Sequence, residues 1–346
     1  MRIFQALSLL AVLAGICSPA IAQEAGPPAV ETNAAATQSD ERLLDAVVVS
    51  GRVKGPGLWK VSKGGHVMWV LGTTSPLPRG IDWDTRELEE KIGQSQEWIQ
   101  APGATFSPKG GVVGGLLLLP AALKVRKNPE GRRLHEVIPV SDYARWQRLK
   151  TQYLPKDDDA EQWRPYFAGQ ALYQAALAKH GLGGSRVGKT VADLAKRPRL
   201  RVTDPLERMK VEGARKLLRE LNTTAVDDVA CMRAYMDLAE HDMAGLIRRA
   251  NAWSVGDTAT LAAESKAMQG DTGACTDITR GSFGKRLGVD AAIERSRARW
   301  LAAVDTAMAR NASTLATLPM GEITRSDGLI AQLRARGYTV ETPDAQ

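Results

Sequence analysis

Two neighbouring stretches near the start of the chain are mainly apolar. The apolar segments Leu58 to Ser62 and His66 to Leu71 flank the short linker Lys63-Gly64-Gly65. Two such segments joined by a Gly-rich linker predict a β-hairpin. A compact run rich in Val, Leu44 to Gly51, predicts an edge strand before the hairpin.

Helical spacing dominates the middle of the chain. The pattern Asp84-x-x-Glu87 indicates a capping box. The helix that it opens is expected to continue through residues at helical spacing, Leu88, Ile92, Ser95 and Ile99. Ser141 and Asp159 are expected to cap two further helices. Residues 204–310 are helical in pattern nearly throughout.

Strand-like segments return at the end of the chain. Leu315 to Leu318 and Tyr338 to Glu341 lie on either side of a short predicted helix, Asp327 to Arg336. Because strands occupy both ends and helices fill the middle, we expect an α+β fold in which strands from both ends form one sheet around a large, mainly helical middle. In this interpretation residues 44–346 form a single domain.

The most apolar internal run extends from Val112 to Leu123. Gly114, Gly115 and Pro120 interrupt it, so we interpret it as a buried hinge between short elements and not as a membrane span. No other segment after the N-terminus is long and apolar enough to be a transmembrane segment.

The N-terminus has the three parts of a secretion signal. Arg2 precedes an apolar core, Ile3 to Ile16, and Ala20-Ile21-Ala22 fits the small-x-small rule for cleavage. Residues 1–22 are therefore predicted to be a signal peptide, and residues 23–43, rich in Ala, Pro, Thr and Glu, a flexible linker. This predicts a protein of the periplasm or a secreted protein.

Export bears on the cysteines and on the charge. The two cysteines that follow the signal, Cys231 and Cys275, are expected to form one disulfide. The formal net charge is +7, which favours an anionic partner such as an anionic envelope surface or the acidic face of another envelope protein. Nucleic acid is not expected outside the cytoplasm.

One motif points to a chemistry that its context does not support. Residues 183–190 satisfy the phosphate-loop pattern G-x-x-x-x-G-K-T. The pattern requires a preceding strand, whereas Tyr173 to His180 is helical in pattern, so we interpret it as a loop that opens a helix. There is no G-x-S-x-G and no H-E-x-x-H, and no two of the four histidines are spaced as ligands on one helix face. No cofactor is therefore expected.

Both ends of the chain resemble a known family. Leu58-Trp59-Lys60-Val61 with Val67 to Thr73, and Asp327 to Val340, resemble the two ends of the TraB/GumN family, which includes the Tiki metalloproteases. Arg249 to Asp257 and Glu294 to Trp300 are similar to its helical middle. The resemblance covers roughly Leu58 to Val340.

This resemblance implies a metal site, from which the chain departs at three positions. Active members hold a metal with two Gly-x-x-His motifs, one near each end, and a glutamate after the first helix. Here the first motif is Gly72-Thr73-Thr74-Ser75, the glutamate position is Gln100, and the second motif is Pro319-Met320-Gly321-Glu322. If the family architecture holds, Ser75, Gln100 and Glu322 surround one small cleft where the strands from both ends stop.

These departures favour a protein that has lost the family metal site and acts as a non-catalytic binding or scaffolding protein. Ser and Gln are weak neutral ligands, and a single carboxylate does not replace two imidazoles. The alternative is a metal-dependent or Ser-based hydrolase or peptidase with a remodelled site, built from Ser75, Glu322 and Asp327. A Ser nucleophile needs a base, so close approach of His66 to Ser75 would favour the enzyme, and an open polar cleft would favour binding.

The N-terminal pattern gives a first prediction. We expect cleavage after Ala22, so that the mature chain begins at Gln23. Mass spectrometry of the mature N-terminus measures this directly. A chain that retains Met1, or that carries lipid on Cys17, would contradict it.

Overall fold

The computed structural model describes residues 51–196, 200–223, 228–267, 275 and 282–343. The predicted signal peptide (1–22), the linker (23–43) and residues 44–50 of the predicted edge strand lie outside the described residues. The domain boundary proposed at residue 44 therefore stays a prediction.

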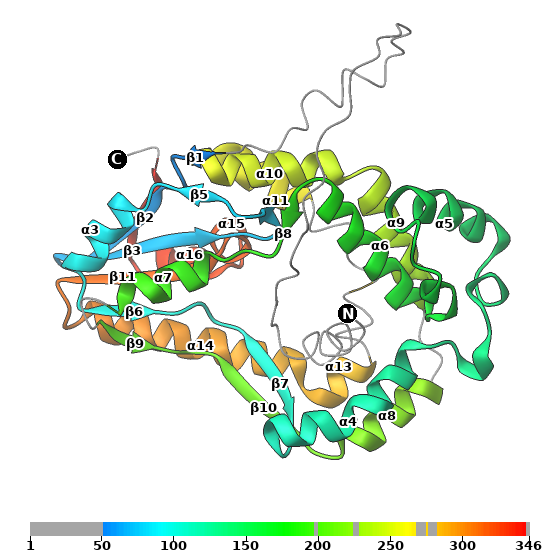
Figure 1. The fold of residues 1–346 in the computed structure, drawn as a ribbon. Helices are drawn as coiled ribbons and strands as arrows, with labels where there is room; N and C mark the ends of the chain where they lie inside the picture. Colours follow the sequence, from blue (N-terminus) through cyan, green and yellow to red (C-terminus); the bar gives the residue numbers. More distant parts are fainter. Residues whose placement is uncertain (1–50, 197–199, 224–227, 268–274, 276–281, 344–346) are drawn as a thin grey trace, which may run out of the picture.

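The centre of the fold is a six-stranded sheet with the order β12-β2-β3-β11-β6-β9 (Figure 1). Its strands are β2 (Leu58–Lys63), β3 (His66–Thr73), β6 (Glu97–Ile99), β9 (Arg201–Thr203), β11 (Ser313–Pro319) and β12 (Thr339–Glu341). Strands β2 and β3 pair antiparallel around Gly64 and Gly65, whose φ angles of 57° and 84° favour glycine. The predicted hairpin is confirmed.

Strands from the two ends of the chain meet in this sheet. Strand β11 lies parallel between β3 and β6, with Thr317 opposite Leu71 and Ala316 opposite Ile99. Strand β12 pairs antiparallel with β2, with Val340 opposite Val61. This confirms the predicted α+β fold with strands from both ends and a large helical middle.

Three smaller strand pairs accompany the main sheet. Parallel pairs join β1 (Arg52–Val53) to β5 (Asp82–Trp83) and β7 (Ala104–Pro108) to β10 (Glu207–Val211), and β4 (Leu77–Pro78) pairs antiparallel with β8 (Leu182–Gly183). The helices that surround the strands are α3 (Arg86–Gln94), α4 (Gly111–Arg126), α5 (Val140–Tyr153), α6 (Pro165–Lys179), α7 (Val187–Ala195), α8 (Ala214–Thr223), α9 (Asp228–Glu240), α10 (Met243–Val255), α11 (Thr258–Ala267), α13 (Ser282–Leu287), α14 (Val289–Met308), α15 (Met320–Thr324) and α16 (Leu329–Ala335).

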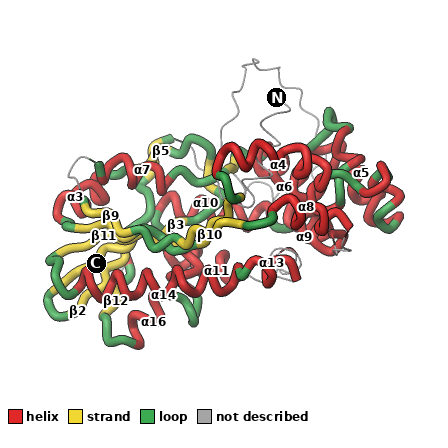
Figure 2. The backbone as a smooth tube through the Cα atoms, turned by 90° about the horizontal axis from the view of Figure 1, so that it is seen from below, coloured by secondary structure: helices red, strands yellow, loops and turns green. Residues whose placement is uncertain are grey.

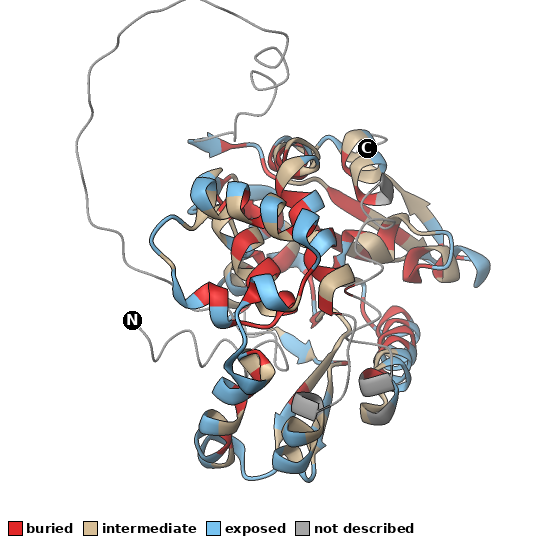
Figure 3. Ribbon diagram, turned by 90° about the vertical axis from the view of Figure 1, so that its right-hand side faces the viewer, coloured by how far each residue is buried: buried red, intermediate tan, exposed pale blue. Residues whose placement is uncertain are grey.

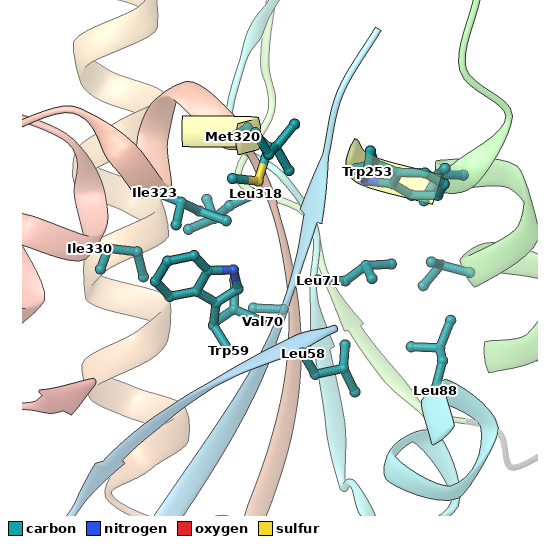
Figure 4. Close-up of a cluster of buried hydrophobic side chains, with 14 of the residues drawn as sticks. Leu58, Trp59, Val70, Leu71, Leu88, Trp253, Leu318, Met320, Ile323 and Ile330 are labelled. Carbon is teal, nitrogen blue, oxygen red and sulfur yellow. The ribbon is translucent and has the colours of Figure 1, made fainter. Parts of the chain in front are cut away.

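Residues along the strands point alternately to opposite sides of the sheet. Helices cover both sides, so both faces are buried. Figure 4 shows Trp59 and Val70 on the side of Ile323 and Ile330, and Leu71 on the side of Leu88 and Trp253. The sheet therefore lies between the helices α15 and α16 on one side and the helices α3 and α10 on the other. Figure 3 shows many buried residues in the upper part of the molecule, where the sheet and the helices of the middle region overlap in that view.

A second core lies among the helices α5, α6 and α9, beside the sheet (Figure 2). Fully buried residues, among them Trp146, Leu172 and Met232, hold these helices together. The sulfur atom of Cys231, on α9, lies 1.94 Å from that of Cys275, with Cα atoms at 4.6 Å. This agrees with the predicted disulfide.

The strands β7 and β10 and the helices α4 and α8 form an arm that extends away from the sheet (Figure 1). The prediction of a buried hinge over Val112 to Leu123 is wrong, because a single helix, α4, runs through Gly114 and Pro120 with much of its apolar surface exposed. None of the described helices is both long and apolar enough to cross a bilayer.

Several predicted helix boundaries also need correction. Thr85, not Asp84, precedes α3, and the expected capping box does not form because the Asp84 carboxylate binds Arg86. The helix ends at Gln94, and Ile99 lies in β6. Asp159 begins a short 3-10 helix, whereas α6 begins at Pro165. Two segments of the middle, β9 and β10, are strands.

The disulfide should contribute strongly to stability, which gives a second prediction. It closes a loop with a sequence separation of 44 residues, and the chain-entropy model gives about 4 kcal/mol for such a loop. We expect the double variant Cys231→Ala, Cys275→Ala to lose roughly 2–4 kcal/mol of unfolding free energy. Urea denaturation with and without a reducing agent measures this; equal stability of the oxidised wild type and the variant would contradict it.

Candidate functional site

Three neighbouring strands end at the same edge of the sheet. Because β3, β11 and β6 are parallel, their carboxyl ends lie side by side. Ser75 follows β3, Gln100 follows β6, and Glu322 follows β11. In parallel sheets, ligands usually bind at this edge. The structure thus brings the three strand ends together, but the three side chains make different contacts.

Apolar side chains fill the space next to the end of β3. A Cβ atom on Gly72 would lie 2.4 Å from the sulfur of Met320 and 3.2 Å from Ile323, so a larger residue here would have to displace the Met320 side chain. The indole Nε1 of Trp253 donates to the carbonyl oxygen of Gly72 at 2.8 Å. Figure 4 shows Met320 and Trp253 on either side of this strand end.

Little space remains in this packing. The cavity between Gly72, Trp253 and Met320 measures about 10 Å³, which corresponds to about one water molecule. The glycine of the first motif therefore serves packing here, and the adjacent space does not admit a substrate.

Ser75 is exposed and is held through its backbone. Its carbonyl oxygen accepts a hydrogen bond of 2.6 Å from Nη2 of Arg249, which comes from α10. Burial lowers the pKa of Arg249 below its ordinary value; the group still carries its charge at neutral pH. A guanidinium next to Ser75 disfavours a metal cation at this position.

The first requirement of the Ser-based alternative is not met. His66 begins β3 and Ser75 follows its end, so the strand separates them by roughly 25 Å. The Nδ1 atom of His66 lies 2.7 Å from the carbonyl oxygen of Asn311. Asp327 is also no suitable base, because hydrogen bonds from Arg325 lower the pKa of its carboxyl.

The loop after β6 is pinned to α14. The Gln100 backbone N–H donates to Thr203 at 2.9 Å, which continues the pairing of β6 with β9. The buried hydroxyl of Ser296 accepts from the Gly103 N–H and donates to the Pro205 carbonyl oxygen, both at 2.8 Å. Ser296 thus joins the loop after β6, which contains Gln100 and Gly103, and the loop after β9 to α14.

Both carboxylate oxygens of Glu322 are used in structural contacts. Oε1 accepts from Nη1 of Arg297 at 2.5 Å, and Oε2 accepts from the N–H of Leu329 at 3.2 Å. Arg297 also donates to the carbonyl oxygen of Asp327 at 2.8 Å. Both side chains are largely buried, with 9% of Arg297 and 15% of Glu322 exposed. We call this the Arg297–Glu322 pair; it fastens α15 and α16 to α14.

The donor groups at these positions do not fit the metal that the family resemblance implies. A divalent transition metal prefers imidazole, thiolate and carboxylate ligands. Ser75 and Gln100 are neutral and weak, and Glu322 is bound to a cation. In the part of the chain that the structure describes, no group of three or more His, Cys, Asp or Glu residues could hold a metal ion.

A second, larger cavity of about 350 Å³ is lined in part by Trp83. Its wall combines the loop from Lys54 to Leu58 with the start of α3, including Asp84, Arg86 and Glu87. Arg86 donates to both oxygens of Asp84 at 2.9 Å, and this lowers the pKa of Asp84 well below its usual range. The charged wall groups are thus already paired in part.

Sequence reasoning missed the two arginines that contact the candidate positions, Arg249 at Ser75 and Arg297 at Glu322. Arg297 shares a helical stripe with Trp300, Leu301 and Val304, all of them buried. A charged residue on an apolar stripe indicates a buried ion pair, so this partner could have been suspected. No comparable pattern distinguishes Arg249 from the other arginines of the middle region.

Comparison with known proteins agrees with this architecture. The model of the TraB/PrgY/gumN family matches residues 57–342. No curated protein and no solved structure gave a significant match.

The Arg297–Glu322 pair gives a third prediction. Removing one partner of a buried ion pair costs about 3–5 kcal/mol because the other charge stays buried. We expect Arg297→Met and Glu322→Met each to destabilise the protein strongly, and the double variant to lose less than the sum. Urea denaturation measures all three changes.

An exposed pair provides the matched control. Lys189 and Asp193 pair on α7 with 65% and 45% of their side chains exposed, so the same cycle should give at most about 1 kcal/mol of coupling. Equal coupling in both cycles would show that the Arg297–Glu322 pair has no special structural role.

Proposed function

This chain belongs to the TraB/PrgY/gumN family, whose model matches most of its length, and on that premise we propose that it is a non-catalytic member. In this proposal the chain keeps the family fold, has lost the family metal site, and works as a binding or scaffolding protein in the periplasm or after secretion.

One observation carries the proposal: Glu322, the only carboxylate among the three ligand positions, binds Arg297 and the Leu329 N–H. To reach a metal, Glu322 would have to leave Arg297, a largely buried cation, with only the exposed Glu294 at 3.6 Å and the Asp327 carbonyl oxygen as partners. The remaining two positions offer only a hydroxyl and an amide. The loss of metal ligands is thus accompanied by a structural reuse of the one acidic group that remains.

The packing near Gly72 does not provide the open polar cleft that would favour binding at this strand edge, so it supports only the non-catalytic part of the proposal. Met320 follows β11 directly and, together with Trp253, fills the space beside the first motif. An enzyme needs room for a substrate at its reacting groups. A scaffold benefits from the opposite, because a filled strand edge holds β3 and β11 rigidly for whatever binds elsewhere on the surface.

A fourth prediction tests the loss of metal binding. The purified protein should bind no stoichiometric Zn²⁺, Mn²⁺ or Co²⁺, as measured by metal analysis and calorimetric titration. The double change Ser75→His, Glu322→His should raise metal affinity, because it restores two imidazoles at the strand ends. Adding Arg297→Gln should raise it further, since the double variant leaves the Arg297 cation beside the metal.

Two controls make the result interpretable. Gln96→His, at the other end of β6, adds an imidazole to the sheet without restoring the site and should leave metal affinity unchanged. Tight metal binding by the wild type that disappears in Glu322→Ala would reverse the proposal, because it would identify Glu322 as a ligand.

A further inference from the structure

The arm formed by β7, α4, β10 and α8 carries most of the net positive charge of the protein. Residues 104–127 contain four Lys or Arg and no acidic residue, and residues 207–223 contain five Lys or Arg and three Glu. Nine cations against three carboxylates give the arm +6, whereas the whole chain has a formal net charge of +7. The rest of the protein is therefore close to neutral.

The same arm exposes an apolar stripe on α4. Its members are between 40% and 82% exposed. They are Val112, Val113, Leu116, Leu117 and Leu123. Residues on the opposite side of the helix, such as Leu118 and Val125, are buried. At 100° per residue, the five exposed residues share one face, which we call the α4 stripe.

Basic residues border the α4 stripe at both ends. Lys109 precedes the helix, and Lys124 and Lys127 continue the same face after Leu123. Beside the stripe, Nη2 of Arg215 on α8 donates to the Leu117 carbonyl oxygen at 3.3 Å. An aliphatic surface thus lies within a basic rim, at the end of the molecule that lies below the sheet in Figures 1 and 3.

We propose that the α4 stripe binds an anionic lipid surface, with the aliphatic side chains among the acyl chains and the lysines on the head groups. Helices that lie in a membrane interface combine an apolar face with flanking Lys and Arg. Each Lys or Arg close to an anionic bilayer adds about 1 kcal/mol of attraction. The helix is about 24 Å long and binds on the surface without crossing the bilayer.

Charge and composition distinguish lipid from the other possible occupants. A second copy of the chain would bring two arms of +6 together, which electrostatic repulsion opposes. Specific protein interfaces are usually centred on Trp, Tyr or Arg, and the α4 stripe contains only Val and Leu. Acyl chains need no such anchors, so the aliphatic composition favours lipid.

The contacts at the end of α4 hold the stripe in place. The guanidinium of Arg126 lies 3.2 Å from the ring centre of Trp163, and the Arg126 carbonyl oxygen accepts from the Arg164 N–H at 2.9 Å. The helix thus follows β7 at one end and is held at the other end by Trp163 and Arg164, which directly precede α6. This surface lies outside the strand edge with Ser75 and Glu322, so the inference does not depend on the proposed function.

Flotation with lipid vesicles tests the inference on the full purified protein. The probes are vesicles of phosphatidylcholine alone and of equimolar phosphatidylglycerol and phosphatidylcholine. We expect binding to the anionic vesicles that weakens as salt rises. Leu116→Gln with Leu117→Gln should lower the partition coefficient at least about tenfold, and Lys124→Gln with Lys127→Gln about fivefold per lysine.

Matched controls come from α5. Val140 is 85% exposed and Lys156 follows the same helix, so Val140→Gln and Lys156→Gln make the same chemical changes outside the arm. Both should bind as the wild type does, and circular dichroism should show all variants folded. Equal binding by wild type and stripe variants, or no binding to anionic vesicles, would overturn the inference. Sedimentation equilibrium that shows a dimer lost in the Leu116, Leu117 variant would assign the stripe to a second copy instead.

Discussion

The fold depends on the backbone hydrogen bonds that β11 makes along both of its edges. This strand comes from the last tenth of the chain, yet it lies between β3 and β6 in the middle of the sheet. Until it is in place, the N-terminal hairpin and the strands β6 and β9 have no common partner. The pairing of Ser313 with Val67 also joins residues far apart in sequence, and such non-local contacts slow folding. The helical middle must therefore be compact enough to bring the two ends together.

The same pairing explains how the fold tolerates different side chains after the strand ends. The strand ends are brought together by backbone hydrogen bonds and by buried residues such as Leu315 and Leu318, not by the side chains that follow them. What those side chains do can therefore change. In this chain Met320 packs against Gly72, and Glu322 binds α14 through Arg297. Both side chains therefore contribute to the packing between the sheet and its C-terminal helices.

The sequence predicts long, regular elements better than short ones. The hairpin was predictable because its two apolar segments flank a Gly-rich turn, and β11 because Leu315 to Leu318 form a short, mainly apolar run near the C-terminus. Strand β6 was missed because it has three residues and Ile99 continues the helical spacing of α3. Strand β10 was missed because its five residues, Glu-Arg-Met-Lys-Val, include three charged ones and no run of apolar residues. The continuity of α4 was missed because Pro120 was weighed as a break, whereas on an exposed helix face the carbonyl that a proline leaves unpaired can bind water.

For the site, the family resemblance led us to expect the strand ends side by side, but the contacts of Glu322 were not predictable. An ion pair between α14 and α15 depends on how a helix crosses the sheet, which no local pattern specifies. Sequence reasoning could identify which ligands were absent. It could not identify the contacts made at these positions, because the partners of Ser75 and Glu322 come from other parts of the chain, α10 and α14.

The sheet ends on each side in a strand of only three residues, β12 and β9. A short edge offers few free N–H and C=O groups to a strand from another molecule. Glu341 on β12 pairs with Lys60 at 3.0 Å, and β9 begins with Arg201, so charge is present at both edges. The interior strands β3 and β11 are rich in Val and Leu and would be strong templates for cross-β assembly if they were exposed. Placing them in the centre, with short charged strands outside, protects the protein from edge-to-edge aggregation at the high concentrations of a crowded compartment.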